Sequence, residues 1–220
     1  MEARLQIVCL VIIMYISVIY IKETSGKMKV SCNCLFDAIL AIAPWAVVFD
    51  GFSAITVNHR DAINANINLF AHGMFFLCMN LVIIVSFFYM LDITIGRPKR
   101  LKTILYLMPG IISIVLMLLY LPKLEFIKGS FTDYSMGTSV YISFLSFTFY
   151  YGAMLAIMFI HRKTVESKKW YSMLFIIVIA FLTLIVQYFA NRLLSLLLIL
   201  DRSLHHQLCA EGLAKEKIHQ

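Results

Sequence analysis

Long apolar runs separated by short polar loops are the feature that most limits how this chain can fold. Six runs of 17 to 25 residues are almost entirely apolar. A helix needs about 20 such residues to cross the hydrocarbon core of a bilayer. Hydrophobic residues make up 61% of the 220 residues and charged residues 14%, whereas soluble domains average about 45–50% and about 25%. The sequence therefore predicts an all-α, polytopic membrane helix bundle.

The six predicted spanning helices are residues 5–21, 35–57, 67–91, 103–121, 138–160 and 171–190. The first run is short, and a signal peptide is the alternative to a retained helix. We favour the helix because Glu2 accompanies Arg4 before the run and no small-residue cleavage site precedes the basic stretch that follows. Because the loops are short, consecutive helices are expected to be antiparallel neighbours.

The carboxyl-terminal part departs from this pattern. Asn191 and Arg192 interrupt the apolar sequence, and the apolar residues 193–200 are too few to span a bilayer. We therefore expect a transmembrane bundle over residues 1–200, with a possible partial seventh helix, and a polar tail over 201–220. The tail would lie outside with six spans and inside with seven, and the sequence leaves both open.

The distribution of basic residues predicts how the chain is oriented. Loops 22–34, 92–102 and 161–170 hold 11 Lys and Arg, whereas the amino end and loops 58–66 and 122–137 together hold 4. Basic loops remain in the cytoplasm, so the amino terminus is expected outside a plasma membrane that the chain crosses several times. This bias also accounts for the net charge of +7. Since no basic stripe interleaved with aromatic residues occurs, nucleic acid is not expected as a partner.

Motifs of soluble enzymes are missing from the sequence. It contains no G-x-x-x-x-G-K-[ST], G-x-G-x-x-G, H-E-x-x-H or G-x-S-x-G pattern. Cys32 and Cys34 lack a second Cys or His pair at ligand spacing, and His59 and His72 lack a third ligand. We therefore expect no enzyme activity, no metal site and no cofactor.

Two ionisable residues fall well inside apolar runs, where charged groups are costly and face a bundle interior or a cavity. Asp50 lies seven residues before Val57, so it is about 10 Å deep at 1.5 Å per residue. His72 lies about 8 Å inside the following run, which the chain enters from the same side. The matching depths predict that Asp50 and His72 touch, directly or through water.

Other polar residues fall near the same level and could complete an outward-facing pocket. Asn64, Asn68 and His72 follow one another at intervals of four and so form a stripe on one helix face. The predicted ligand-binding residues are Asp50, Thr56, Asn58, His59, Asn68, His72 and Gln187. A structural network that ties helices together, a ligand or ion pocket and a proton relay are all consistent with this set.

Several segments resemble one known family. Residues 48–59, VFDGFSAITVNH, resemble a recurring segment in the amino-terminal membrane regions of Firmicutes signalling proteins, many of which end in a GGDEF-type diguanylate cyclase domain. Residues 68–76, NLFAHGMFF, resemble the third helix of those regions, and residues 134–143, YSMGTSVYIS, resemble the start of the fifth. Gln187 matches a polar position in the sixth helix, and the likeness covers roughly residues 5–190.

The resemblance implies a multi-helix sensory input region. The family continues through a seventh helix into a cytoplasmic output domain, whereas here Asp201 and Arg202 follow the short apolar stretch. We therefore expect either a truncated protein or a stand-alone membrane module. Cyclase activity is not expected, because no residues match a GGDEF motif.

A bacterial sensory or signal-transduction module is thus the leading functional hypothesis. A small transporter or transporter subunit, with the same polar residues along a substrate path, is the alternative, and an intramembrane enzyme is a third class. The expected partners are the lipid bilayer and an unidentified small ligand, and a homodimer is left open.

The charge distribution yields a test of orientation. In a protein whose native cysteines have been removed, Lys99→Cys and Lys168→Cys should resist a membrane-impermeant thiol reagent added to intact cells, because both positions lie in basic loops. Both should react once the membrane is opened. Labelling of either position in intact cells would contradict the predicted orientation.

Overall fold

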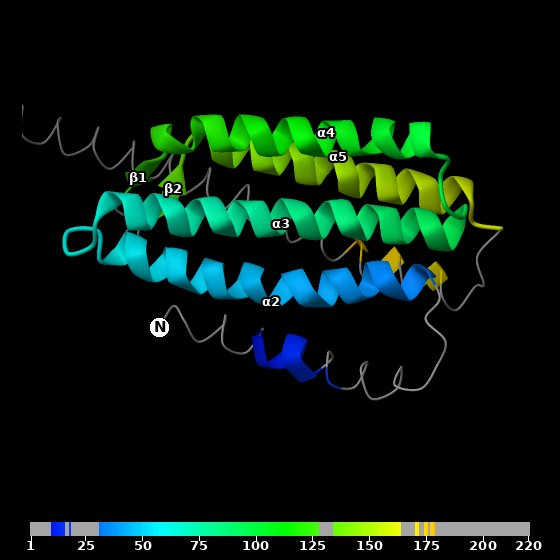
Figure 1. Ribbon diagram of the computed structural model, residues 1–220, viewed down its shortest axis with the longest axis horizontal. Coiled ribbons are helices and arrows are strands. Elements are labelled where there is room, and N and C mark those ends of the chain that lie inside the picture. The colour runs from blue at the N-terminus through cyan, green and yellow to red at the C-terminus, as the bar shows by residue number, and fades with distance from the viewer. Residues whose placement is uncertain are drawn as a thin grey trace, which may run out of the picture. The chain divides into compact units, whose positions relative to one another are not determined.

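The described part of the chain is mostly helical. The computed structural model describes residues 10–15, 18, 31–127, 134–163, 170–171, 174–175 and 177–178 (Figure 1). Among these residues, four helices are long and apolar enough to cross a membrane. The chain therefore has the character of a helical membrane protein. The first and sixth predicted spans lie mostly outside the described residues, although the described residues of both are helical.

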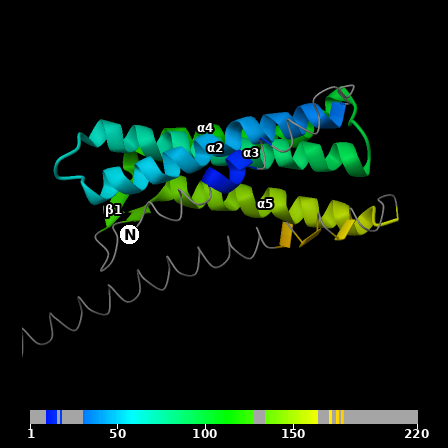
Figure 2. The same ribbon diagram turned by 90° about the horizontal axis from the view of Figure 1, so that it is seen from below.

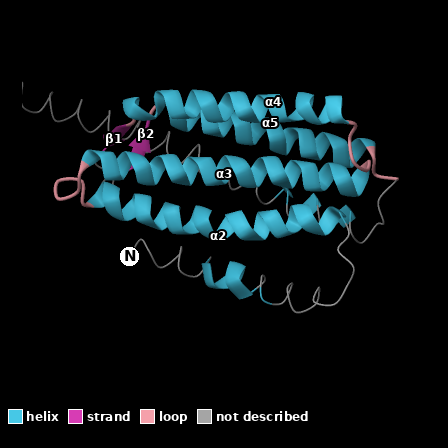
Figure 3. Cartoon of the chain, viewed as in Figure 1, coloured by secondary structure: helices cyan, strands magenta, loops and turns pink. Residues whose placement is uncertain are grey.

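The described elements are α2 (Ser31–Asn58), α3 (Ala65–Thr94), α4 (Arg100–Tyr120), the 3-10 turn η1 (Leu121–Lys123), β1 (Glu125–Ile127), β2 (Tyr134–Met136) and α5 (Thr138–Ile160). Figure 3 shows these helices and strands by class. The four helices agree with the predicted spans 35–57, 67–91, 103–121 and 138–160 to within four residues at each end. Helix α5 begins and ends where the sequence predicts.

Helix α3 is the centre of the bundle. It contacts α2, α4 and α5, and the two views in Figures 1 and 2 show the helices running side by side. Its 30 residues correspond to about 45 Å, more than the hydrocarbon thickness of a bilayer. At its start the side chain of Asn64 accepts a hydrogen bond of 2.9 Å from the backbone N–H of Asn66, which satisfies one of the unpaired donors of the first turn.

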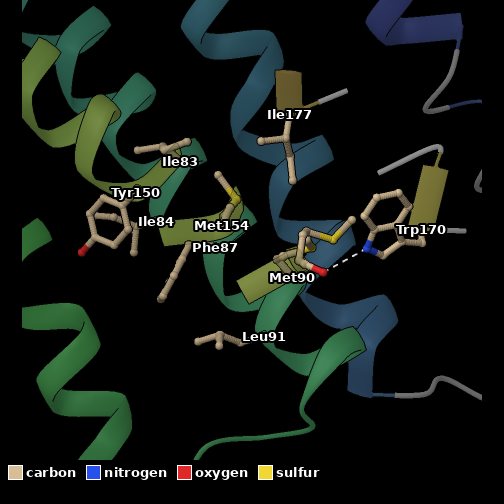
Figure 4. Close-up of a cluster of buried hydrophobic side chains, with 10 residues drawn as sticks. Ile83, Ile84, Phe87, Met90, Leu91, Tyr150, Met154, Trp170 and Ile177 are labelled. Atoms are coloured by element: carbon tan, nitrogen blue, oxygen red, sulfur yellow. Dashed lines mark hydrogen bonds between the residues drawn. The ribbon is translucent and has the colours of Figure 1, made fainter. Parts of the chain in front are cut away.

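The larger apolar cluster lies among α3, α5 and the residues that follow α5. It contains Ile83, Ile84, Phe87, Met90, Leu91, Tyr150, Met154, Met158, Trp170 and Ile177 (Figure 4). The indole Nε1 of Trp170 donates a hydrogen bond of 3.0 Å to the carbonyl oxygen of Met158. This bond satisfies the polar atom of a large ring that is otherwise buried in apolar surroundings.

Segment 122–137, treated above as a loop, contains a short antiparallel hairpin. Strands β1 and β2 pair Phe126 with Ser135 at the centre of their register. Gly137 separates the hairpin from α5 with a φ of 152°, a backbone conformation that side chains disfavour. A Cβ at Gly137 would also lie 3.3 Å from the carbonyl oxygen of Lys123. The hairpin and the 59–64 turn lie at the same end of the bundle, hereafter the hairpin end (Figure 1).

Gly110 on α4 allows close approach to the two neighbouring helices. A Cβ at this position would lie 2.5 Å from Cδ1 of Ile84 and 2.7 Å from the phenol oxygen of Tyr150. That phenol donates a hydrogen bond of 3.0 Å to the carbonyl oxygen of Tyr106. Small residues at helix contacts permit such packing in membranes, where the hydrophobic effect does not drive helices together.

The close packing at Gly110 predicts a position-specific loss of stability. Gly110→Ala should lower the free energy of unfolding by about 1–3 kcal/mol, because the added methyl group overpacks the contact. The measurement is an SDS titration of the purified full chain in mixed micelles. Gly152→Ala on α5 is the control, since nothing lies within 4 Å of its Cβ position, and it should be neutral or stabilise by up to about 1 kcal/mol. Equal effects of the two substitutions would contradict the packing argument.

Candidate functional site

A buried hydrogen bond joins α2 to α3 near the hairpin end. The hydroxyl of Thr56 lies 2.9 Å from Oδ1 of Asn68 and 3.0 Å from the carbonyl oxygen of Ser53, so its single hydrogen is shared between two acceptors. Thr56 is 0% exposed and Asn68 2% exposed. A polar link of this kind contributes to helix pairing in an apolar environment, because the alternative is an unsatisfied polar group.

His72 extends this link by one helical turn. Its Nδ1 lies 3.0 Å from the carbonyl oxygen of Asn68, and the residue is buried. A carbonyl can only accept, so Nδ1 carries the hydrogen in this bond. We refer to Thr56, Asn68 and His72 as the polar network.

The hairpin covers the polar network. The ring of Phe126 on β1 stands edge-on to the His72 ring, with centroids 5.3 Å apart. The guanidinium of Arg60, in the turn between α2 and α3, donates a hydrogen bond of 2.9 Å to the carbonyl oxygen of Phe126. Phe76, one turn further along α3, contacts the same imidazole with centroids 6.3 Å apart. The hairpin and the turn are therefore attached to each other above His72.

Sequence reasoning identified Thr56, Asn68 and His72 but missed Arg60 and Phe126. In the sequence Arg60 contributes only to the number of basic residues in loop 58–66. Phe126 belongs to a strand of three residues, too short to show the alternation that marks a strand. Both residues follow from the fold of the loops and not from any helical spacing.

The remaining predicted site residues have different surroundings. Asp50 is half-buried on α2, six residues before Thr56, or about 9 Å along the helix axis, and its backbone carbonyl accepts a hydrogen bond of 2.8 Å from the Ser53 hydroxyl. Its contact with His72 stays a prediction. Asn58 donates a hydrogen bond of 2.9 Å to the carbonyl oxygen of Ala54 on its own helix. His59 is exposed in the turn.

Gln187, the last predicted site residue, lies outside the described residues. Within the described part of the chain, no three His, Cys, Asp or Glu side chains are arranged so that they could hold a metal ion. The described site is a buried, hydrogen-bonded network beneath the hairpin and the 59–64 turn. Such a network can join helices, and it changes if the cover above it moves.

Comparison of the chain with protein families, with curated proteins and with solved structures gave no match.

The link between Thr56 and Asn68 predicts a measurable coupling. Thr56→Val should lower the free energy of unfolding by about 1–3 kcal/mol, because it leaves the buried Oδ1 of Asn68 without its donor. The double variant Thr56→Val/Asn68→Leu should lose less than the sum of the single variants, with a coupling of about 0.5–3 kcal/mol. SDS titration of all three variants measures both quantities.

Thr148→Val is the matched control for this cycle. The Thr148 hydroxyl is exposed and bonds only to the carbonyl oxygen of Phe144 on its own helix, so the change should stay within about 0.5 kcal/mol of the wild type. Strict additivity of the Thr56 and Asn68 variants would show that the two side chains do not depend on each other.

Proposed function

We propose that this chain is a membrane sensory module of the kind found in bacterial signalling proteins, with six spanning helices and its amino terminus outside the plasma membrane. On this proposal the hairpin end faces outward and receives the signal. The likeness of segments 48–59 and 68–76 to the sensory regions described above supports the class of protein. The charge asymmetry between the loops supports the orientation.

The observation that carries the proposal is an unbroken series of contacts from the surface loops to a buried helix pair. Arg60 holds the backbone of Phe126, and the ring of Phe126 contacts His72. His72 bonds to the backbone of Asn68, whose side chain in turn accepts from Thr56 on α2. A ligand that displaces the hairpin would therefore alter contacts within the α2–α3 pair.

A sensor must also change its conformation in response to its ligand. A ligand shifts a conformational equilibrium only if it binds the two states with different affinity. Binding near the 59–64 turn, at Asn58 or His59, would favour one position of the hairpin over another. Asp50, deeper on the same helix, offers a carboxylate to a small polar or cationic ligand, and Gln187 is proposed to complete the site.

A transporter or transporter subunit is the second candidate function. The observation that favours it is the presence of buried polar side chains on α3 at successive depths, namely Asn68, His72 and Asn80. Such residues line substrate paths in many transporters. A transporter requires a water-filled path that reaches the middle of α3, whereas a sensor does not.

Distance measurement between spin labels tests the sensory proposal. One label is attached to the native Cys34, which is exposed on α2, and the other to Ile160→Cys at an exposed position on α5. Both positions lie at the end of the bundle opposite the hairpin. The other native cysteines are replaced by serine. Arg60→Met removes the hydrogen bond to Phe126 without shortening the side chain greatly. It should shift the mean label distance by about 1–2 Å, the size of a typical signalling helix displacement.

Lys123→Met is the matched control, because Lys123 is an exposed cation at the same end that lies over the Tyr120 ring and outside the polar network. It should leave the distance unchanged. Identical distance distributions for Arg60→Met and the wild type would overturn the sensory proposal. Modification of a sole remaining Cys78, which is 7% exposed on α3, by a charged water-soluble thiol reagent would instead favour the transporter.

A further inference from the structure

The apolar core of the bundle is divided into two clusters along the helix axes. The cluster nearer the hairpin end contains Phe76, Met117 and Val140, one from each of α3, α4 and α5, together with Leu124. The cluster toward the opposite end begins at Ile83 on α3. The two clusters are separate groups of fully buried residues, and the apolar side chains of Leu77, Ile114 and Phe144 around the interval between them are only partly buried.

Buried polar residues occupy the interval between the clusters. Asn80 on α3 is 0% exposed, Ser113 on α4 is 8% exposed and Ser146 on α5 is 6% exposed. Ser143 on α5 is 2% exposed. We call these four residues the polar layer.

The contacts between helices place these residues at similar depths. Ile84 meets Gly110 across α3 and α4, and Phe87 meets Tyr106 with ring centroids 5.8 Å apart. In an antiparallel pair this register sets Asn80 opposite Ser113.

The register of the parallel helices α3 and α5 places the serine residues of α5 near the level of Asn80. Phe87 and Tyr150 have ring centroids 5.3 Å apart. Asn80 lies seven residues before Phe87, and Ser143 lies seven residues before Tyr150, so Asn80 and Ser143 are at the same level. Ser146 lies within one turn of that level, about 4.5 Å along the axis.

Three oxygen atoms of the polar layer have no hydrogen-bond partner among the described residues. They are Oδ1 of Asn80, Oγ of Ser113 and Oγ of Ser146. The amide nitrogen of Asn80 is satisfied, because it donates a hydrogen bond of 2.9 Å to the carbonyl oxygen of Phe76. Ser143 is also satisfied, by a bond of 3.1 Å to the carbonyl oxygen of Ser139. The unpaired atoms therefore come from three different helices and lie within about one helical turn of the same depth.

We propose that the polar layer is a binding site for an ordered water molecule that bridges α3, α4 and α5. Buried waters typically make about three hydrogen bonds to polar groups that lack other partners. Oδ1 of Asn80 only accepts, whereas the two serine hydroxyls donate or accept, so a water with two donors and two acceptors complements all three.

A metal cation fits the polar layer less well than water. No Asp or Glu occurs on α3, α4 or α5 within two turns of the layer. An unbalanced charge held by three neutral oxygen atoms at this depth would be costly in a bilayer. Water fills the same positions without that cost.

The bridging water specifies how the three helices align. If α4 slid by one turn, about 5.4 Å, Ser113 would lie beside apolar residues of one cluster and lose the shared water. The polar layer therefore selects one register among helices whose apolar surfaces are otherwise similar. This alignment of the helices does not depend on the proposed sensory role.

Radiolytic labelling with X-rays tests the proposal directly. Hydroxyl radicals formed from a bound water oxidise neighbouring side chains even when these are buried. Met117 and Met158 are both 0% exposed, but Met117 lies one turn from Ser113, whereas Met158 lies three turns from Ser146. In the full chain in nanodiscs, Met117 should be oxidised faster than Met158.

Substitution should abolish this difference. Ser113→Ala, and the triple variant Asn80→Leu/Ser113→Ala/Ser146→Ala, should lose the excess oxidation of Met117. Ser143→Ala should retain it, because the hydroxyl of Ser143 is already bonded within its own helix. The single Ser113→Ala variant keeps the test valid if the triple variant does not fold.

Two results would overturn the proposal. One is equal oxidation of Met117 and Met158 in the wild type, which shows that no water is bound near Ser113. The other is an increase in unfolding temperature with sodium chloride over choline chloride at equal ionic strength, lost in Ser113→Ala. That result would assign the polar layer to a cation.

Discussion

The need to pair every backbone N–H and C=O group within the chain determines most of this structure. A bilayer interior offers these groups no water, so each spanning segment must form its own hydrogen bonds as a helix. Once the helices exist, lipid is as apolar as their side chains, and the hydrophobic effect no longer selects which faces meet. Selection then depends on close packing at small residues such as Gly110 and on polar links such as Thr56 to Asn68. These few contacts therefore carry much of the specificity of the bundle.

The positions of the described helices were predictable because apolar length alone marks a spanning segment. Helix α5 agrees with its apolar run at both ends, whereas α2 begins four residues before its run, at Ser31, and α3 continues three residues past its run, to Thr94. A helix continues into polar sequence as long as its hydrogen bonds are satisfied, and hydropathy does not detect that extension. The hairpin was not predictable, because strands of three residues carry no periodicity and their pairing is set by the loop itself.

The same limits apply to the candidate site. Spacing of four residues placed Asn68 and His72 on one face of α3, and depth matching brought Thr56 to the same region, so the polar network was accessible from sequence. The contact of the hairpin and the 59–64 turn above His72 could not be predicted, because the hydrogen bond of Arg60 to Phe126 joins segments 66 residues apart. The sequence marks Asn80 only as a polar residue within an apolar run. Its relation to Ser113 and Ser146 depends on the register between helices, which hydropathy does not contain.

The two polar features of the bundle differ in a way that bears on motion. In the polar network each described bond joins protein atoms directly, so displacing the hairpin changes contacts of His72 and, through them, the α2–α3 pair. In the polar layer the helices meet through unpaired side-chain oxygens, and a bridging water can re-form its bonds after a small displacement more readily than a direct side-chain pair. Helix α3 takes part in both features, through His72 and through Asn80. On the sensory proposal, a displacement that begins at the hairpin end would meet a direct connection first and a water-mediated one at mid-depth, and α3 would be the element that couples the two ends of the bundle.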